Sequence, residues 1–346
     1  MADYGLRTKD ALARVTLDTS VTPIRSLRMM TVTGNGSFDQ YFSIPEIQAE
    51  SFVVVDTLED RGEFTYSPAA WYSAGTLQLR QPLTTTWQVM ILSRGGEGGG
   101  GVTYGIRTRN NSVLTQIDSV NRALTIRSSG QFQIGQQSGT INLWADINFP
   151  APITTYERPL IFLNAVDYMM VGNFSVKGGP GNWTGFRLKA YPHPNHGSAW
   201  LSFMTIRWFC SSYQAGSIEA GAYGARVSDG SGVLLFATTM NITSLHSQPA
   251  SNSFVQAGTS LPGAGGANAP SQQMPWTGSY DDYVLANALF SCTNVVQTTQ
   301  PIRANFGGWW PGNRSMLQMY CENGSGINPL TANGRTLFAA RPMRPL

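Results

Sequence analysis

The sequence is short of charged residues and shorter still of lysine. Charged side chains make up 12% of the 346 residues, about half of the share usual in soluble domains. Lys9, Lys177 and Lys189 are its lysines, so arginine carries nearly all of the positive charge in a net charge of +3. The arginines are spread along the chain without a basic run, and we therefore expect no nucleic-acid partner. Their excess over lysine fits guanidinium groups buried in contacts, or codon bias alone.

Cysteine is also scarce, and the long apolar runs of membrane proteins are missing. Cys210, Cys292 and Cys321 are widely spaced and odd in number, which fits neither a metal finger nor a complete disulfide framework. We expect buried thiols. The opening residues 1–15 lack the apolar stretch of a signal peptide, and no run approaches the roughly 20 apolar residues of a membrane span. The sequence thus predicts synthesis in the cytoplasm without a signal peptide, and no stable membrane insertion.

The motifs of metal, phosphate and nucleophile sites are missing as well. His193 and His196 stand in a proline-containing loop without a nearby cysteine or acid, so we interpret them as loop histidines without a metal. The glycine run 95–101 and the stretch 178–181 lack the Lys-Ser/Thr ending of a phosphate loop. No Gly-x-Ser-x-Gly follows an apolar strand in a βα context. We expect no catalytic residue, no metal and no cofactor.

One cluster of acids could supply the carboxylates of a glycosidase. That chemistry needs a pair of carboxylates, one on each side of the scissile bond. The run 56–63 contains Asp60-Arg61-Gly62 after the strand-like residues 52–55. We interpret it as a solvated turn whose charges pair with Arg61. The acids of the cluster are Glu46, Glu50, Asp56, Glu59, Asp60 and Glu63.

What the sequence does contain is glycine, proline and aromatic residues, together with an internal repeat. The 37 Gly and 19 Pro predict frequent turns, and the aromatic and β-branched content favours strands. The string Tyr-Gly-x-Arg begins at Tyr4, Tyr104 and Tyr223. Each copy is followed by a polar turn and a second alternating stretch, which predicts three β-hairpins. The clearest predicted turn is 229–232.

The far ends of the three copies also correspond. Each has an aromatic residue, an alternating strand, a loop and a last strand, as expected when one sheet face is buried and the other is wet. The alternating strands are 77–80, 186–189 and 317–320, and the last strands are 87–93, 200–207 and 335–343. We therefore predict an all-β chain of three tandem, diverged β-sandwich or jelly-roll-like modules. The predicted boundaries are 1–94, a glycine-rich linker at 95–103, 104–220 and 221–346.

Surface aromatic residues are the remaining candidates for a site. Trp276, Trp309 and Trp310 lie in surroundings rich in glycine, proline and asparagine, where exposed rings stack on sugars or fill a partner's pocket. The alternative for Trp309 or Trp310 is a core position like those of Trp71 and Trp183. Trp276 follows the stretch 262–275, which we interpret as an extended surface loop. With His193 and His196, the three tryptophans form our predicted set of surface or receptor contacts.

The ends of the chain resemble a known family. The opening Met1-Ala2-Asp3-Tyr4-Gly5-Leu6-Arg7, with Val15-Thr16-Leu17-Asp18, is similar to the start of small virion proteins encoded among the tail genes of siphophages, and Phe338-Ala339-Ala340-Arg341-Pro342-Met343 is similar to their closing strand. The match covers the ends well and the middle poorly, and the apparent triplication departs from the family.

The resemblance implies a role in the tail tip, baseplate or fibre region of phages of Gram-negative bacteria, without catalytic residues. We expect a virion protein that binds other tail proteins, forms a homo-oligomer as a trimer or ring, and contacts a host receptor such as a pilus or polysaccharide. The alternative is a carbohydrate-binding or glycan-degrading protein of tandem β-sandwich modules. Carbohydrate binding without cleavage that is lost on Trp276→Ala would favour a receptor-binding role over a scaffold.

Overall fold

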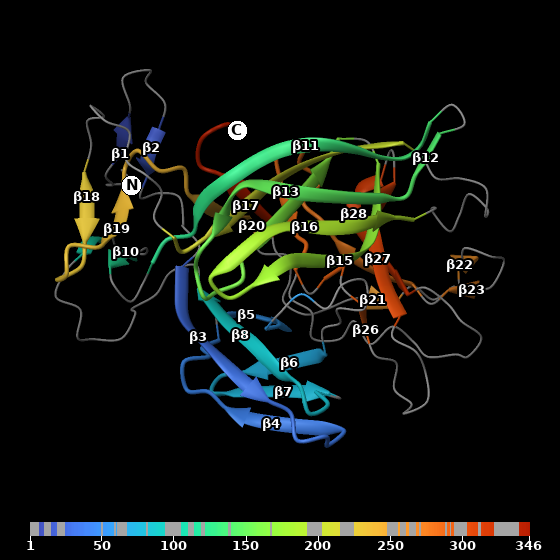
Figure 1. The fold of residues 1–346 in the computed structure, drawn as a ribbon, viewed down its shortest axis with the longest axis horizontal. Coiled ribbons are helices and arrows are strands. Elements are labelled where there is room, and N and C mark those ends of the chain that lie inside the picture. The colour runs from blue at the N-terminus through green and yellow to red at the C-terminus, as the bar shows by residue number, and fades with distance from the viewer. Residues whose placement is uncertain are drawn as a thin grey trace, which may run out of the picture.

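The described residues of the computed structural model form strands and turns and contain no helix, which confirms the predicted all-β class. Figure 1 shows the strands stacked in layers. The residues that the structure describes are 7–9, 15–18, 25–49, 51–58, 60, 68–80, 82–93, 105–109, 114–118, 122–137, 140–166, 168–191, 203–214, 225–247, 255–256, 261–262, 268–269, 271–287, 289–290, 292–293, 303–310, 313–321 and 339–346.

A hairpin forms at each copy of the Tyr-Gly-x-Arg string. The strands are β1 (Arg7–Lys9) with β2 (Val15–Asp18), β9 (Gly105–Arg109) with β10 (Leu114–Asp118), and β18 (Arg226–Ser228) with β19 (Leu234–Ala237). The first and third hairpins share one register: Arg7 pairs with Asp18 as Arg226 pairs with Ala237, and both ladders shift after the second pair. The middle hairpin is a regular ladder. In the third, the Asp229 carboxylate accepts the N–H groups of residues 231 and 233, which forms the predicted turn.

After the first hairpin, two three-stranded sheets pack face to face. The strands of this first segment are β3 (Arg25–Thr33), β4 (Asp39–Ser43), β5 (Phe52–Thr57), β6 (Ala69–Ser73), β7 (Thr76–Arg80) and β8 (Thr86–Ser93). One sheet has the order β3-β8-β5 and the other β4-β7-β6. Their inner faces meet in a core that includes Val55, Leu77, Leu79 and Val89. Burial of apolar area at about 25 cal/mol per Å² stabilises this contact.

The same order of pairing returns twice along the chain. The second segment contains β11 (Thr125–Gln137), β13 (Trp144–Ile153), β14 (Leu160–Ala165), β15 (Met169–Gly179), β16 (Asn182–Ala190) and β17 (Met204–Ser212). The third contains β20 (Thr243–Ser247), β24 (Ser271–Pro275), β25 (Tyr283–Leu285), β27 (Arg303–Trp310), β28 (Asn313–Cys321) and β29 (Ala339–Pro342). If the six strands of each segment are numbered from one to six in the order given, the sheets have the same strand order in all three segments. One sheet has the order 1-6-3 and the other has the order 2-5-4.

The second and third segments are fused edge to edge. β14 pairs with β25, and β15 pairs with β27, both antiparallel, so third strand joins third strand and fourth joins fourth. The result is one seven-stranded sheet and one eight-stranded sheet. Gly308 lies at this seam, where an added Cβ would collide with the Met169 carbonyl oxygen. Further strands in or beside these sheets are β12 (Thr140–Asn142), β21 (Val255–Gln256), β22 (Leu261–Pro262), β23 (Asn268–Ala269) and β26 (Cys292–Thr293).

The first segment packs against the outer face of the seven-stranded sheet. Phe52 and Val54 of β5 meet Leu160 and Phe162 of β14 in a second core cluster, and the Phe162 ring stacks on Phe209 at 4.7 Å. β5 and β14 are buried along their whole length. This explains why both read as continuous apolar runs rather than alternating ones.

Buried arginines connect the segments. The Arg158 guanidinium donates to the Thr57 carbonyl at 2.6 Å and lies 3.5 Å from the Asp56 carboxylate. Arg314 donates to the Asn164 side chain at 2.7 Å and to the carbonyls of residues 165 and 166. These contacts support the interpretation that arginine is abundant because its planar fork satisfies carbonyls and carboxylates inside the protein.

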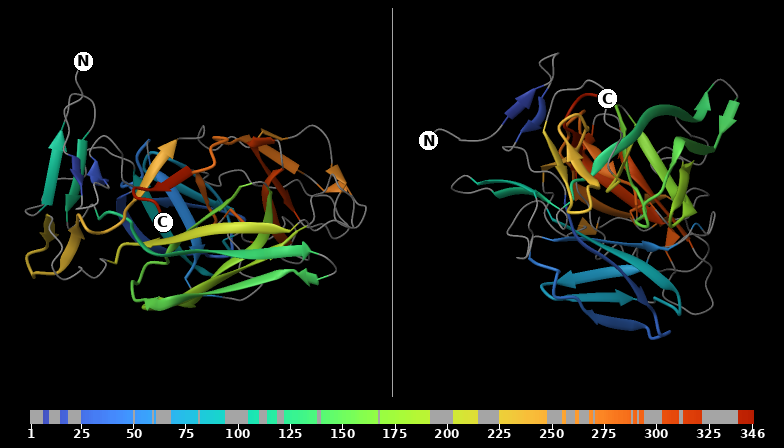
Figure 2. Two further views of the ribbon diagram at one scale, coloured as in Figure 1. Left: turned by 90° about the horizontal axis from the view of Figure 1, so that it is seen from above. Right: turned by 60° about the vertical axis from the view of Figure 1, so that its left-hand side comes forward.

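The hairpins gather at one end of the molecule. β18 contacts both β9 and β10, and Ile117, Val227 and Phe236 share a small core cluster. β1 and β2 lie at the same end in Figure 1 and in the left view of Figure 2. The predicted glycine-rich linker at 95–103 and the boundary near residue 220 lie outside the described residues, so both stay predictions.

Candidate functional site

The structure buries Trp276, which we expected on the surface. Its side chain is 5% exposed and stacks on Trp309 with ring centroids 6.1 Å apart. The expected surface loop is wrong in part: residues 271–275 form β24, which pairs with β28. The backbone N–H of Trp276 then donates to the Ser315 carbonyl at 2.7 Å. Because the sheet continues to this point, the indole turns into the core instead of toward solvent.

Trp309 is also a core residue, as the alternative interpretation had it. It is fully buried, its indole N–H donates to the Ala165 carbonyl at 3.1 Å, and Arg314 lies 4.5 Å over its ring. The Trp310 side chain and both His193 and His196 lie outside the described residues. The two described members of the predicted contact set, Trp276 and Trp309, are therefore brought together, but inside the core and not on the surface.

The aromatic residues of the three closing regions take different places. Trp183 and Trp309 are fully buried, whereas Trp71 is half-buried on β6. Trp71 and Trp309 lie on the fourth strand of their segments, and Trp183 lies on the fifth. The expected common core position is wrong for Trp71. Its side chain belongs to the outer face of a sheet, because its neighbour Ala70 faces the core.

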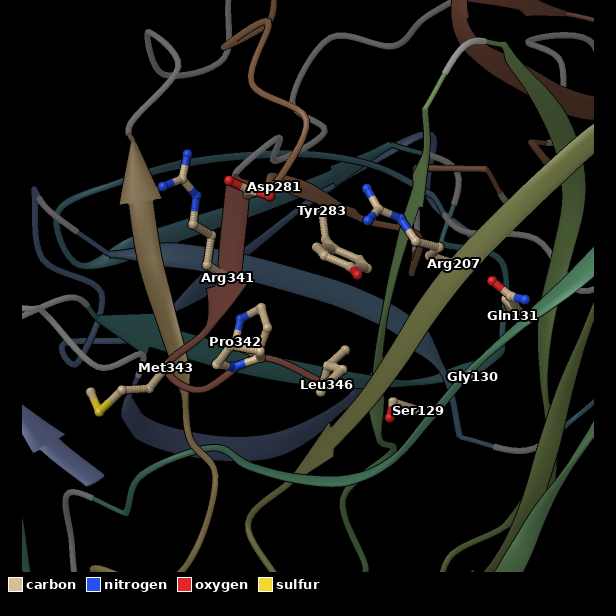
Figure 3. A pocket seen from close by; sticks show the side chains of 11 residues that line it. Ser129, Gly130, Gln131, Arg207, Asp281, Tyr283, Arg341, Pro342, Met343 and Leu346 are labelled. Atoms are coloured by element: carbon tan, nitrogen blue, oxygen red, sulfur yellow. The ribbon is translucent and has the colours of Figure 1, made fainter. Parts of the chain in front are cut away.

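A pocket of about 670 Å³ lies on the outer face of the seven-stranded sheet. Figure 3 shows its lining residues, which come from β11, β17, β25 and β29 and from the residues just before β25 and just after β29. Side chains alternate along β17, where residues 206, 208 and 210 join the main core and residue 207 points to the opposite face. The pocket is lined by Ser129, Gly130, Gln131, Arg207, Asp281, Tyr283, Arg341, Pro342, Met343, Pro345 and Leu346.

Two arginines give the pocket its polar character. Arg207 donates to the Tyr280 carbonyl at 2.7 Å, and its guanidinium lies 5.8 Å over the Tyr283 ring. Arg341 donates to the buried Asp282 carboxylate at 2.5 Å. Burial raises the pKa of Tyr283, Arg207 lowers it and Asp281 raises it, with a net upward shift. The phenol therefore stays protonated at neutral pH.

These pocket residues are suited to contact a polar group of a partner, since the two arginines are accompanied by Asp281 and Asp282. Guanidinium groups donate in plane to carboxylates, and Gln131 adds an amide beside them. Sequence reasoning missed Arg207 as a site residue, although an arginine inside the apolar run 204–210 was a usable signal. Within the described residues, no group of three or more histidine, cysteine or acidic side chains is placed to hold a metal ion.

Two acids of the cluster, Asp56 and Asp60, pair with arginines of the second segment. Asp56 is buried against Arg158, so the expectation of a surface position is wrong for it. Asp60 accepts from Arg187 of β16 at 2.6 Å, and Glu46 pairs with Arg28 of β3. Glu50, Glu59, Arg61 and Glu63 lie outside the described residues.

Comparison with protein-family profiles, curated proteins and solved structures returned no match to this chain. No helix among the described residues is long and apolar enough to cross a membrane.

Proposed function

We propose that this protein is a structural component of a bacteriophage tail, placed at the tail tip, baseplate or fibre region. The observation that carries the proposal is the gathering of the Tyr-Gly-x-Arg hairpins at one end of the molecule (Figure 2). The first of these hairpins follows the motif that resembles siphophage virion proteins. An end surface shared by these hairpins is suited to dock on a neighbouring tail protein.

The architecture supports a scaffold. Fused sheets, continuous buried strands and buried arginines tie the segments together, and rigid units of this kind build large interfaces between subunits. We propose assembly with other tail proteins and a homo-oligomer, as a trimer or ring. No catalytic step, cofactor, nucleic acid or membrane insertion is part of the proposal.

The proposal is tested on purified particles of a phage that carries the gene. We expect mass spectrometry to find the protein in particles washed at high salt, and immunogold electron microscopy to place it at the end of the tail. Light scattering of the isolated protein should give a mass above that of one chain. Absence from washed particles would refute the tail role, and a monomer at high concentration would refute the homo-oligomer.

A second candidate function is carbohydrate binding without cleavage, which would serve contact with a host receptor. The observation that favours it is an exposed aromatic face on the first segment, away from the tryptophans that the sequence pointed to.

A further inference from the structure

The outer face of the sheet β4-β7-β6 carries a row of aromatic and amide side chains. Tyr41 and Trp71 both lie directly opposite Gln78, one from each neighbouring strand. Directly opposite residues share a face, and the adjacent residues Leu77, Leu79 and Ala70 are buried on the other one. Tyr41 is 66% exposed, and Trp71 and Gln78 are half-buried. The row therefore faces outward.

A fixed polar network lies beside this row. The Asp39 carboxylate accepts from Arg80 Nε at 3.0 Å and from Gln78 Nε2 at 3.2 Å. The Arg80 guanidinium lies 5.2 Å from the Phe38 ring centroid and 4.9 Å from that of Trp71. Phe38 is itself 46% exposed. One positive and one negative group neutralise each other here, and their contacts hold the side chains in place.

We propose that this face, which we call the Tyr41–Trp71 face, binds a polysaccharide built from neutral pyranoses. A pyranose offers an apolar C–H face to an aromatic ring and hydroxyl groups around its edge. Rings flanked by an amide, a carboxylate and a guanidinium match both parts. Because the charges compensate each other, the face favours a neutral glycan over an acidic one.

The spacing fits an extended glycan chain. Tyr41 and Trp71 are separated by two interstrand distances, about 9.6 Å, which is comparable to the length of a disaccharide unit. Gln78 lies between them, in reach of hydroxyl groups. Since Asp39 already orients Gln78 and Arg80, binding immobilises few side chains and costs little conformational entropy.

The inference rests on the receptor-contact part of the proposed function and names the surface and the ligand class for it. It is tested with the full chain by affinity electrophoresis in gels that contain hydroxyethyl cellulose, laminarin, galactomannan or an O-polysaccharide freed from lipid A, with alginate as the acidic comparison. We expect retardation by at least one neutral polysaccharide and weaker retardation by alginate.

Tyr41→Ala is the informative variant, because a side chain this exposed contributes little to folding. We expect it to weaken binding roughly tenfold, as loss of a central aromatic contact does. Tyr156→Ala is the matched control, since Tyr156 is 49% exposed but lies on another segment. It should bind as the parent does. Equal thermal melting of the three proteins checks the fold.

Three outcomes overturn the inference: no retardation by any neutral polysaccharide, equal binding by the parent and Tyr41→Ala, or a change of oligomeric state in Tyr41→Ala without a change in glycan binding. The last would assign the face to a second copy of the chain. None of them affects whether the protein is found in washed particles, so failure here is separate from failure of the tail role.

Discussion

Replacing Arg158 with methionine tests whether buried arginine holds the first segment to the second. Arg158 is 3% exposed. Its guanidinium donates to the Thr57 carbonyl at 2.6 Å and to the Thr57 hydroxyl at 2.9 Å, and it lies 3.5 Å from the Asp56 carboxylate and 4.9 Å from the Trp183 ring. Methionine keeps part of the aliphatic chain and removes all of these polar contacts.

The magnitude follows from what the substitution leaves behind. Each hydrogen bond from a charged donor contributes about 1.5–3 kcal/mol, and removal of one partner of a buried ion pair costs about 3–5 kcal/mol because the other charge stays buried. Burial lowers the pKa of Arg158, while Asp56 and then Asp60 raise it, and the net shift is downward, so desolvation of the guanidinium outweighs both attractions. The backbone N–H of Arg158, which donates to the Gln88 side chain at 2.9 Å, survives the change. We therefore expect Arg158→Met to lower the free energy of unfolding by about 3–5 kcal/mol.

Urea unfolding of the full chain measures this effect, and a double variant identifies its cause. Asp56→Asn in the Arg158→Met background should cost less than the sum of the two single changes, because the unpaired carboxylate is removed. Lys177→Met is the control: Lys177 pairs with Asp146, whose side chain is 60% exposed, and exposed pairs contribute about 0–1 kcal/mol. Equal destabilisation by Arg158→Met and Lys177→Met would refute the reasoning.

Four further changes test other parts of the fold. Gly308→Ala places a methyl group against the Met169 carbonyl at the seam of β15 and β27, and we expect a loss of about 3 kcal/mol or more in thermal unfolding. Gly75→Ala, where nothing lies near the added Cβ but φ is +76°, should cost about 1 kcal/mol. Trp276→Ala should lower the free energy of unfolding by about 3–5 kcal/mol, as for a core tryptophan. If the variant were as stable as the parent, Trp276 would be a surface residue, as the sequence predicted. Burial raises the pKa of the Cys210 thiol, so the unfolded chain loses this proton first, and stability should fall as pH rises above about 8.5. Urea unfolding at several pH values should show a flatter decline for Cys210→Ala, and identical slopes would contradict the buried thiol.

The local pairing could be predicted from the sequence to a useful extent. The Tyr-Gly-x-Arg strings and the polar turns that follow them mark hairpins that the structure contains, including the turn that begins at Asp229. The alternating stretches 77–80, 186–189 and 317–320 are strands. These features depend on neighbours within about 20 residues, and that is the range in which periodicity and turn chemistry act.

The candidate site could not be predicted in the same way, because it is made of residues from distant strands. Arg207 and Tyr283 meet only where β14 lies between their strands in the seven-stranded sheet. Likewise, the glycine-rich surroundings of Trp276 indicate a loop, but β28 supplies the edge that turns residues 271–275 into a strand. The exposure of an aromatic side chain depends on which distant residues cover it, and the composition of its own neighbourhood in the sequence does not identify them.

The seam between the second and third segments has a consequence for how the protein unfolds. A strand at the edge of a sheet leaves N–H and C=O groups open to pairing with other chains, and here β14, β15, β25 and β27 cover one another in pairs. Neither segment can melt without returning two edges to solvent. Heat or denaturant should therefore release the two segments together, as one cooperative unit, and a truncation that removes either of them should turn the remaining one into an aggregating fragment.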